Sequence, residues 1–465
     1  MKLGLCGGIC GLITGGLCIL GGALVLIVLP RLIQKEEFYI GFDKNGSYNE
    51  LTQRWIEIPY YMSLQIWTFS IINLPEVINN GTHPKFSERG PYSFTLHQHK
   101  SKVEFSQNDT TVLYRNKYTY HFNQKLSCGN CRITDRVIIP DPIFQVIVFF
   151  QKSFLQSVIF NFHFFCTIYV LFFQMMFDGF ESPLIHGICS KKLIKPICEG
   201  ANIPEKIGFF YKQNDTDDGE FLVDTGLLNS KNLAKVLKYN GQPSLPSSYW
   251  YSEQARMING SEELIPPGLS SSDRIYMFLG QLKRFFSLSF KETVNVAGVP
   301  AWRYTMPPEL YDPHLIENRG FCNPSTPVYF DAITQPAGCL PRGFLDIGST
   351  QLGNPRIYLS GSHFYYSPSA VYENFNGFTP PSVSNDETIF DIEPVRNFFF
   401  GPNINTWSLL IFFLICEGVR GNIPNMIVPV LWFNETVLFD NTTRSELLDN
   451  LFATKNKACH IYCFE

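Results

Sequence analysis

The sequence predicts an α+β protein, mainly antiparallel β, that an amino-terminal helix attaches to a membrane. Three observations lead to this class. Residues 3–30 carry no charged side chain, alternating apolar and polar residues recur through much of the remaining chain, and Asn-x-Ser/Thr glycosylation acceptors are spread from position 45 to position 441. They predict a cytoplasmic end at 1–4, a transmembrane helix at 5–29 and an extracellular or lumenal domain at 30–465.

The first apolar segment is too long for a cleavable signal, whose apolar region has roughly 7 to 15 residues. A helix over 5–29 spans about 38 Å, which exceeds the hydrocarbon core of about 30 Å. The small residues at 21–23 are followed by LVLIVL, so cleavage there would leave an apolar new terminus. We therefore expect a retained signal-anchor helix.

Small residues of this helix lie on one seam, because they recur at spacings of four and three. The seam consists of Gly4, Gly8, Gly11, Gly15, Cys18 and Gly22. It would let helices approach closely, so we expect packing against a second copy or against a second helix of the same chain. The alternative is that glycine is simply common in membrane helices. Cys6 and Cys10, at the cytoplasmic edge, are either palmitoylated or merely small membrane residues.

The glycosylation acceptors place the bulk of the chain in an extracellular or lumenal compartment. They are Asn45, Asn80, Asn108, Asn214, Asn259, Asn434 and Asn441. Ten cysteines follow the membrane segment, and an oxidising compartment favours disulfides among them. Cys128 and Cys131 form a CxxC motif without a second pair at zinc spacing, which indicates a local disulfide or two unpaired thiols.

Strand patterns dominate the rest of the chain. The runs at 102–105 and 111–122 alternate apolar with polar residues across Gln107-Asn108-Asp109, which predicts a hairpin. Further strand-like runs, punctuated by Gly, Pro and Asn, are PRIYLSGSHFYYSPS, TIFDIEPV and NMIVPVLWFNETV.

Two apolar stretches break the alternation. Residues 143–177 contain eleven phenylalanines and one charge, Lys152. A second membrane crossing is conceivable from length alone, but glycosylation acceptors on both sides favour helices that pack on the domain or expose an apolar surface. The second stretch, 407–416, would reach only about 15 Å as a helix and cannot span a bilayer, so we expect a buried element.

The sequence contains no motif for catalysis. It lacks GxSxG, HExxH, a phosphate-binding GxxxxGK(S/T) and GxGxxG. His97 and His99 would share one face of a strand, but an exposed polar strand is favoured over a metal pair because no third ligand is nearby. Residues 217–220 (DDGE) lack calcium-loop spacing and indicate a solvated loop. A net charge of −4 without a basic block also argues against a nucleic-acid partner. We expect no enzyme, cofactor or metal.

Several strings resemble the class B scavenger receptors, the family of the fatty-acid translocase and the lysosomal integral membrane proteins. They are RGPYSF (89–94), DDGEF (217–221), SYW, MING and IPPGL within 248–269, GVPAWRY (298–304), DIEPV (391–395) and VPVLWFNET (428–436). In the first, Gly90 and Pro91 suit a tight turn. The resemblance implies a β-barrel ectodomain with short helices, a helical head at 143–200, and an apolar tunnel that leads toward the bilayer.

The resemblance also implies a disulfide between Cys322 and Cys339, worth roughly 3 kcal/mol in the chain-entropy model. Two other bridges of the family are replaced, since Ala255, Leu282, Gly320 and Thr350 stand at the aligned positions. Cys189 and Cys198 are a candidate replacement, with two free buried thiols as the alternative. The pairing of the remaining ectodomain cysteines stays open: Cys128, Cys131, Cys166, Cys416, Cys459 and Cys463.

Two departures from the family bear on function. The head segment lacks a basic cluster, and no run of eighteen apolar residues follows the ectodomain, so the usual carboxyl-terminal transmembrane helix is expected to be absent and plasma membrane and lysosome are not separated. We predict a receptor that binds and transfers hydrophobic lipids such as fatty acids, sterols or lipoprotein lipids. The alternative is a receptor or sorting protein that carries a lumenal or extracellular protein on its head. An anchored hydrolase is the least favoured class.

Overall fold

The computed structural model describes residues 38–58, 61–142, 167–183, 187, 189–192, 195–200, 204–296, 299–352, 354–373, 375–393, 398–400, 409–415 and 426–438. Several predictions fall outside these residues. They concern the anchor at 5–29 with its glycine seam, Cys6 and Cys10, residues 143–166, the acceptor Asn441, and Cys166, Cys416, Cys459 and Cys463. All of them stay predictions.

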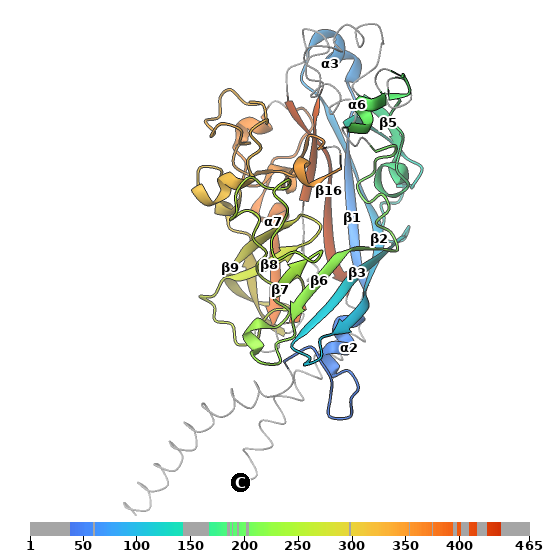
Figure 1. The fold of residues 1–465 in the computed structure, drawn as a ribbon. Coiled ribbons are helices and arrows are strands. Elements are labelled where there is room, and N and C mark those ends of the chain that lie inside the picture. The colour runs from blue at the N-terminus through green and yellow to red at the C-terminus, as the bar shows by residue number, and fades with distance from the viewer. Residues whose placement is uncertain are drawn as a thin grey trace, which may run out of the picture.

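A nine-stranded sheet forms the main body and runs along the length of the molecule (Figure 1). Its strand order is β11-β12-β15-β16-β1-β2-β3-β6-β7. The strands are β1 (Tyr61–Ile71), β2 (Phe86–Phe105), β3 (Thr111–Phe122), β6 (Thr216–Asp224), β7 (Val236–Tyr239), β11 (Phe344–Asp346), β12 (Ile357–Gly361), β15 (Leu409–Ile415) and β16 (Met426–Leu438).

Two smaller sheets accompany it, one of five strands in the order β14-β13-β10-β9-β8 and one that pairs β4 with β5. Their strands are β4 (Arg136–Pro140), β5 (Thr167–Leu171), β8 (Ile275–Leu279), β9 (Arg284–Val296), β10 (Val299–Thr305), β13 (Ile389–Glu393) and β14 (Phe398–Phe400). Every paired strand of the three sheets is antiparallel to its neighbour. The predicted mainly antiparallel class is therefore confirmed.

Helices of the described residues are short: α2 (Glu50–Ile56), α3 (Leu74–Asn80), α6 (Lys195–Gly200) and α7 (Val383–Asp386). Single turns of π- or 3₁₀-helix lie at Gln174–Asp178, Ser230–Asn232, Pro308–Tyr311, Ile316–Phe321, Gly348–Thr350, Ser362–Phe364 and Ser369–Val371. Asn49 caps α2 by accepting a hydrogen bond from the backbone N–H of Thr52. None of these helices is long and apolar enough to cross a bilayer.

The predicted hairpin is confirmed, because β2 and β3 pair directly across residues 106–110. Even-numbered residues face the interior along β3 and from Tyr92 to Lys100 of β2, so Phe94 and Leu96 are buried. The expected tight turn at Gly90-Pro91 is wrong, since these residues lie inside β2, where the register with β1 shifts between Ile66 and Thr68. A Cβ on Gly90 would meet the Trp67 ring at 2.6 Å, so glycine permits close strand packing there.

Two other expectations are wrong, and the element expected at 407–416 is a strand. The described part of the 143–200 head begins with a strand, β5, so the head is not helical throughout. The apolar stretch at 407–416 contains strand β15, which lies between β12 and β16. Residues 217–220 belong to strand β6 and are not a solvated loop, because Asp217 and Glu220 pair with Arg115 on the outer face.

Three disulfides are formed among the described cysteines. Cys322 bonds to Cys339, Cys189 to Cys198, and Cys128 to Cys131. The first closes the loop that the family resemblance implied, and the second joins α6 to the segment before it.

Candidate functional site: a polar cluster inside the nine-stranded sheet

A cluster of polar side chains lies on the inner face of the nine-stranded sheet. We call it the polar cluster and define it as Gln98, Lys100, Asn116, Asp218, Glu262, Glu263 and Glu435. Along β2 the inward positions change from apolar Phe94 and Leu96 to Gln98 and Lys100. The polar cluster therefore continues directly from the apolar core.

Lys100 is the central cation of the polar cluster. It stands opposite Asn116 of β3, its side chain is 0% exposed, and its ammonium forms an ion pair with Glu263. The ammonium also lies 5.6 Å from the ring centre of Trp55 and 5.4 Å from that of Tyr114, within the range of cation–π attraction. A buried lysine needs such partners because an isolated charge is costly away from water.

Glu262 and Glu263 reach the sheet from the segment that precedes β8. Gln98 donates a hydrogen bond to Glu263. Asn116 donates to Oε2 of Glu262 at 2.6 Å, and the Tyr114 hydroxyl donates to the same oxygen at 3.2 Å. Burial, followed by the charges of Asp218 and Glu263, raises the pKa of Glu262 well above its usual range.

Asp218 turns inward from β6, where the Asn116 amide is the side-chain donor that faces its carboxylate. Both of its carboxylate oxygens are buried and have no partner among the described residues, and the same holds for Oδ1 of Asn116. Burial raises the pKa of Asp218 to about 7, while the charge of Lys100 lowers it and that of Glu263 raises it. A buried acceptor without a donor is unfavourable.

Glu435 adds a fourth carboxylate from β16, where it pairs with the inward Leu64 of β1. Burial and the charge of Glu263 raise the pKa of Glu435 to about 7. Four carboxylates thus share one interior with Lys100. Sequence analysis missed this cluster, because only Asn116 lies within the hairpin that it predicted at 102–105 and 111–122, and Gln98 and Lys100 precede that hairpin on β2.

An aromatic cluster lies beside the polar cluster on the inner face, since Tyr92 and Phe94 precede Gln98 and Lys100 along β2. Tyr92 stacks on Phe172 at 3.9 Å between ring centres, Phe94 lies 4.9 Å from Phe177, and Phe177 lies 5.6 Å from Phe210. Its other members are Tyr120, Phe122, Phe173 and Phe433. Four members are only half-buried: Phe122, Phe173, Phe210 and Phe433.

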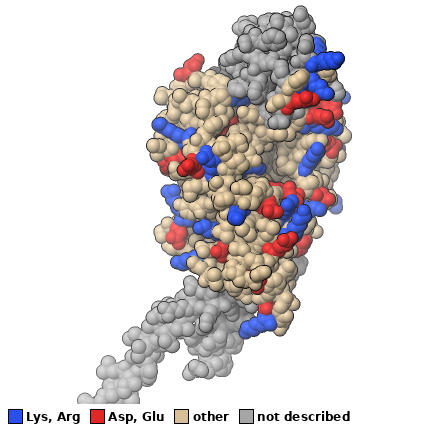
Figure 2. Space-filling model, viewed as in Figure 1, with Lys and Arg blue, Asp and Glu red and all other residues tan. Residues whose placement is uncertain are grey.

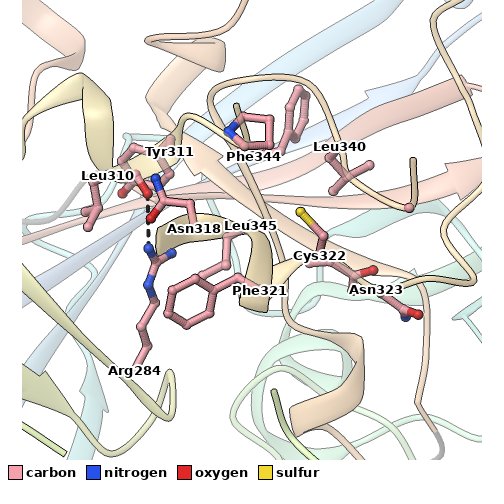
Figure 3. Close-up of a pocket in the computed structure, with 13 residues that line it drawn as sticks. Arg284, Leu310, Tyr311, Asn318, Phe321, Cys322, Asn323, Leu340, Phe344 and Leu345 are labelled. Atoms are coloured by element: carbon pink, nitrogen blue, oxygen red, sulfur yellow. Dashed lines mark hydrogen bonds between the residues drawn. The ribbon is translucent and has the colours of Figure 1, made fainter. Parts of the chain in front are cut away.

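A small pocket lies apart from both clusters, beside the Cys322–Cys339 bridge (Figure 3). Arg284 forms one wall, donates from Nη2 to the Leu310 carbonyl at 3.0 Å, and stacks on Phe321 at 3.8 Å from the ring centre. Burial lowers the pKa of Arg284 to about 10. The cavity volume of about 30 Å³ holds one or two waters, so this pocket is not the predicted lipid tunnel.

His363 is the centre of a separate group of charged side chains. Its Nδ1 lies 2.7 Å from Asp386, and its Nε2 lies 3.4 Å from Glu88. Glu88 also accepts a hydrogen bond from the indole N–H of Trp432 at 2.6 Å, and that ring stacks on Trp67. His363 therefore links β2 to α7 through a buried ion pair with Asp386 and a partly exposed one with Glu88.

The comparisons with known proteins place this architecture in a family. The model of the CD36 family matches residues 13–464. The chain belongs to the CD36 family. Lysosome membrane protein 2 of Rattus norvegicus is 27% identical over 445 residues, which cover 91% of this chain and 86% of that protein. Scavenger receptor class B member 1 of Cricetulus griseus is 26% identical over 439 residues, with 91% and 79% covered.

Lysosome membrane protein 2 of Homo sapiens is 27% identical over 417 residues, which cover 87% of this chain and 80% of that protein. These matches confirm the resemblance to class B scavenger receptors that the sequence strings indicated. The names of these relatives describe a receptor and membrane proteins, and none of them names an enzymatic activity.

Within this CD36-family chain, His97 and His99 lie side by side on β2 with ring centres 6.0 Å apart. His97 contacts Glu57 at 2.9 Å. No group of three or more His, Cys, Asp or Glu residues is placed to hold a metal ion in the described part of the chain. Basic and acidic side chains are interspersed over the described part of the face in Figure 2.

The glycosylation acceptors of the CD36-family ectodomain differ in exposure. Asn45, Asn80, Asn108 and Asn214 are exposed, and Asn259 is half-buried. Asn434 is only 4% exposed in β16, with Nδ2 3.4 Å from Oε1 of Gln65. A glycan on this buried amide would have to displace the packing of β16, so we expect none at Asn434.

Glycan mapping tests this distinction. In full-length chain made in a secretory host, we expect glycans at the four exposed asparagines and none at Asn434. Asn45→Gln should increase gel mobility by one glycan, because exposed acceptors are accessible. Asn434→Gln should leave mobility unchanged. A glycan found on Asn434 of folded protein would contradict the described packing of β16.

Proposed function

We propose that this CD36-family chain is a membrane-anchored, scavenger-type receptor that binds hydrophobic lipids and transfers them through the interior of a barrel-like ectodomain. Fatty acids, sterols and lipoprotein lipids are its expected ligands. The chain works at the plasma membrane or at a lysosomal or endosomal membrane, with its bulk extracellular or lumenal. Its relatives support this localisation, because they include a lysosome membrane protein and a scavenger receptor.

The observation that carries the proposal is the half-buried aromatic cluster on the inner face of the sheet. Aromatic rings that face the interior and still keep accessible surface can contact an apolar guest. They lie beside the described head segment, where a lipid would enter. A sixteen-carbon chain exposes about 15 methylenes at roughly 0.8 kcal/mol each, so an apolar route removes much of a barrier near 12 kcal/mol.

A variant in the aromatic cluster tests the route. Phe210→Glu should lower the transfer of labelled fatty acid or sterol by at least about tenfold, because a carboxylate on an apolar route costs more than about 1.4 kcal/mol. The measurement is transfer between vesicles by reconstituted full-length chain. Leu228→Glu, at a position that is 84% exposed, is the matched control and should transfer normally. Folded wild-type chain that neither binds nor transfers either lipid would defeat the proposal.

A second candidate function is the capture of a lumenal or extracellular protein by the head. One described feature favours it, since Tyr169 of β5 is 67% exposed and exposed tyrosines are typical of binding surfaces. Tyr169→Ala should then weaken a protein complex without changing lipid transfer. If the chain transfers lipid and forms no stable complex with a protein, only the first proposed function remains.

A further inference from the structure

The polar cluster contains more acceptors than the described residues satisfy. Lys100 neutralises Glu263, which leaves Asp218, Glu262 and Glu435 without an ion-pair partner in the described structure. The buried cluster atoms that lack a hydrogen-bond partner among the described residues are Oδ1 and Oδ2 of Asp218 and Oδ1 of Asn116. All three are acceptors, so what the cluster lacks is a hydrogen-bond donor.

The lack of hydrogen-bond donors is also seen at Asn116, which carries no charge. It is 0% exposed, and its Nδ2 already donates to Glu262 at 2.6 Å. Its oxygen is buried in the cluster without a hydrogen-bond donor, which is unfavourable. A proton on a neighbouring carboxyl supplies the missing donor and removes a buried negative charge in the same step.

The other charged and titratable groups that face the cluster do not cancel its negative charge. Lys283 faces Asp218 from the turn between β8 and β9, but its ammonium donates to the Gly280 carbonyl and burial lowers its pKa. The tyrosines there are neutral donors, because burial raises their pKa values. The facing groups are Lys100 from β2, Tyr114, Tyr118 and Tyr120 from β3, Tyr239 from β7, and Lys283.

We propose that the polar cluster is an internal proton-binding site that makes the ectodomain more stable in acid than at neutral pH. Protons enter from water onto Asp218, Glu262 and Glu435, while the Lys100–Glu263 ion pair persists. A carboxyl whose pKa is raised in the folded state binds its proton more tightly there than in the unfolded chain. Stability therefore rises as the pH falls from about 7, where Asp218 and Glu435 titrate, toward their unfolded values near 4.

This inference goes beyond lipid transfer and is independent of it. A chain that is more stable in acid suits a lysosomal or endosomal lumen. The sequence alone does not distinguish this location from the plasma membrane. The proton site also lies beside the aromatic cluster, so its charge would change where a lipid is proposed to pass.

The test is thermal unfolding of the full-length chain in uncharged detergent, at about pH 5 and about pH 8. We expect the wild type to melt about 5 °C higher at the lower pH, given the usual relation between stability and melting temperature. The double variant Asp218→Asn/Glu435→Gln should lose most of this difference by melting higher at pH 8. Because both proteins retain His363, the change in the melting difference reports the polar cluster and not the histidine.

Glu253→Gln, at an exposed carboxylate, is the matched control and should keep the wild-type difference. A second measurement avoids the variants altogether, because infrared spectra of wild-type chain should gain the carbonyl band of buried protonated carboxyls between pH 8 and pH 5. A wild type that melts no higher in acid, a double variant that keeps the full difference, or the absence of that band would each overturn the proposal.

Discussion

Full-length chain with Lys100 replaced by methionine will be less stable than wild type by about 3–5 kcal/mol, the usual cost of breaking a buried ion pair. The methyl-thioether fills most of the lysine volume between Trp55 and Tyr114, so the loss reports the missing charge. Glu263 is left without its cation among four carboxylates. Denaturant unfolding at neutral pH, followed by tryptophan fluorescence, measures the difference.

Two further variants make the Lys100 result specific. Lys117→Met removes the cation of a surface pair with Asp215 on the outer face of the neighbouring strand, and should cost less than about 1 kcal/mol. Lys100→Met combined with Glu263→Gln should recover most of the loss, because neither partner is then a buried unpaired charge. A loss below about 1 kcal/mol for Lys100→Met alone would contradict the buried position of the ammonium.

The hairpin of β2 and β3 could be predicted because its information is local. Apolar residues alternate on both sides of a five-residue connection, and the side-chain period of a strand then fixes which residues point inward. The long strand β16 could be predicted because Pro and Asn residues punctuate its apolar run. Strand β15 was not, because a continuous apolar run fits a buried helix as well as a buried strand.

The polar cluster depends on contacts that no local pattern encodes. Lys100 and Glu263 are 163 positions apart, and Glu435 arrives from the far end of the chain. Asp218 stands in a polar string that indicates a solvated loop, although register places it inside β6. One signal was available, since Gln98 and Lys100 continue the inward register of Phe94 and Leu96. Polar residues in a buried register predict an internal polar site.

Two of the four positions that the resemblance aligns with family cysteines lie next to each other in the structure. A Cβ built on Gly320 would lie 2.8 Å from the Cβ of Ala255. Disulfide-bonded cysteines have Cβ atoms about 3.5–4.5 Å apart, so these positions are neighbours, as the resemblance implies. Small side chains meet at this point, and the backbone N–H of Tyr251 donates to the Gly320 carbonyl at 2.9 Å beside them.

The second large effect is expected at His363, and its sign depends on pH. Burial alone would lower the pKa of this imidazole, but its hydrogen bonds to Asp386 and Glu88 and the charges of both carboxylates raise it to about 9. The unfolded value is near 6.5. The folded chain therefore gains stability that is fully present below about pH 6.5 and is lost as the pH rises through 9.

His363→Gln should cost about 3 kcal/mol near pH 6, because a difference of about 2.5 pKa units corresponds to that free energy. The cost should shrink as the pH rises from about 6.5 and should be nearly gone above 9, since the wild-type imidazole is then neutral as well. Denaturant unfolding of both proteins at several pH values measures the change. His314→Gln, which removes an exposed histidine paired with Asp312, is the matched control and should have no comparable effect.

Backbone conformation gives this prediction a second readout. His363, Phe364 and Tyr366 have positive φ values of 47°, 66° and 73°, which non-glycine residues seldom adopt. The ion pairs of His363 with Glu88 and Asp386 hold this segment against the sheet, so their loss should release it. Proteolysis within 362–367 should accelerate in His363→Gln at pH 6 and not in His314→Gln. An equal loss of stability at pH 6 and pH 10 would instead mean that His363 acts through packing rather than through its charge.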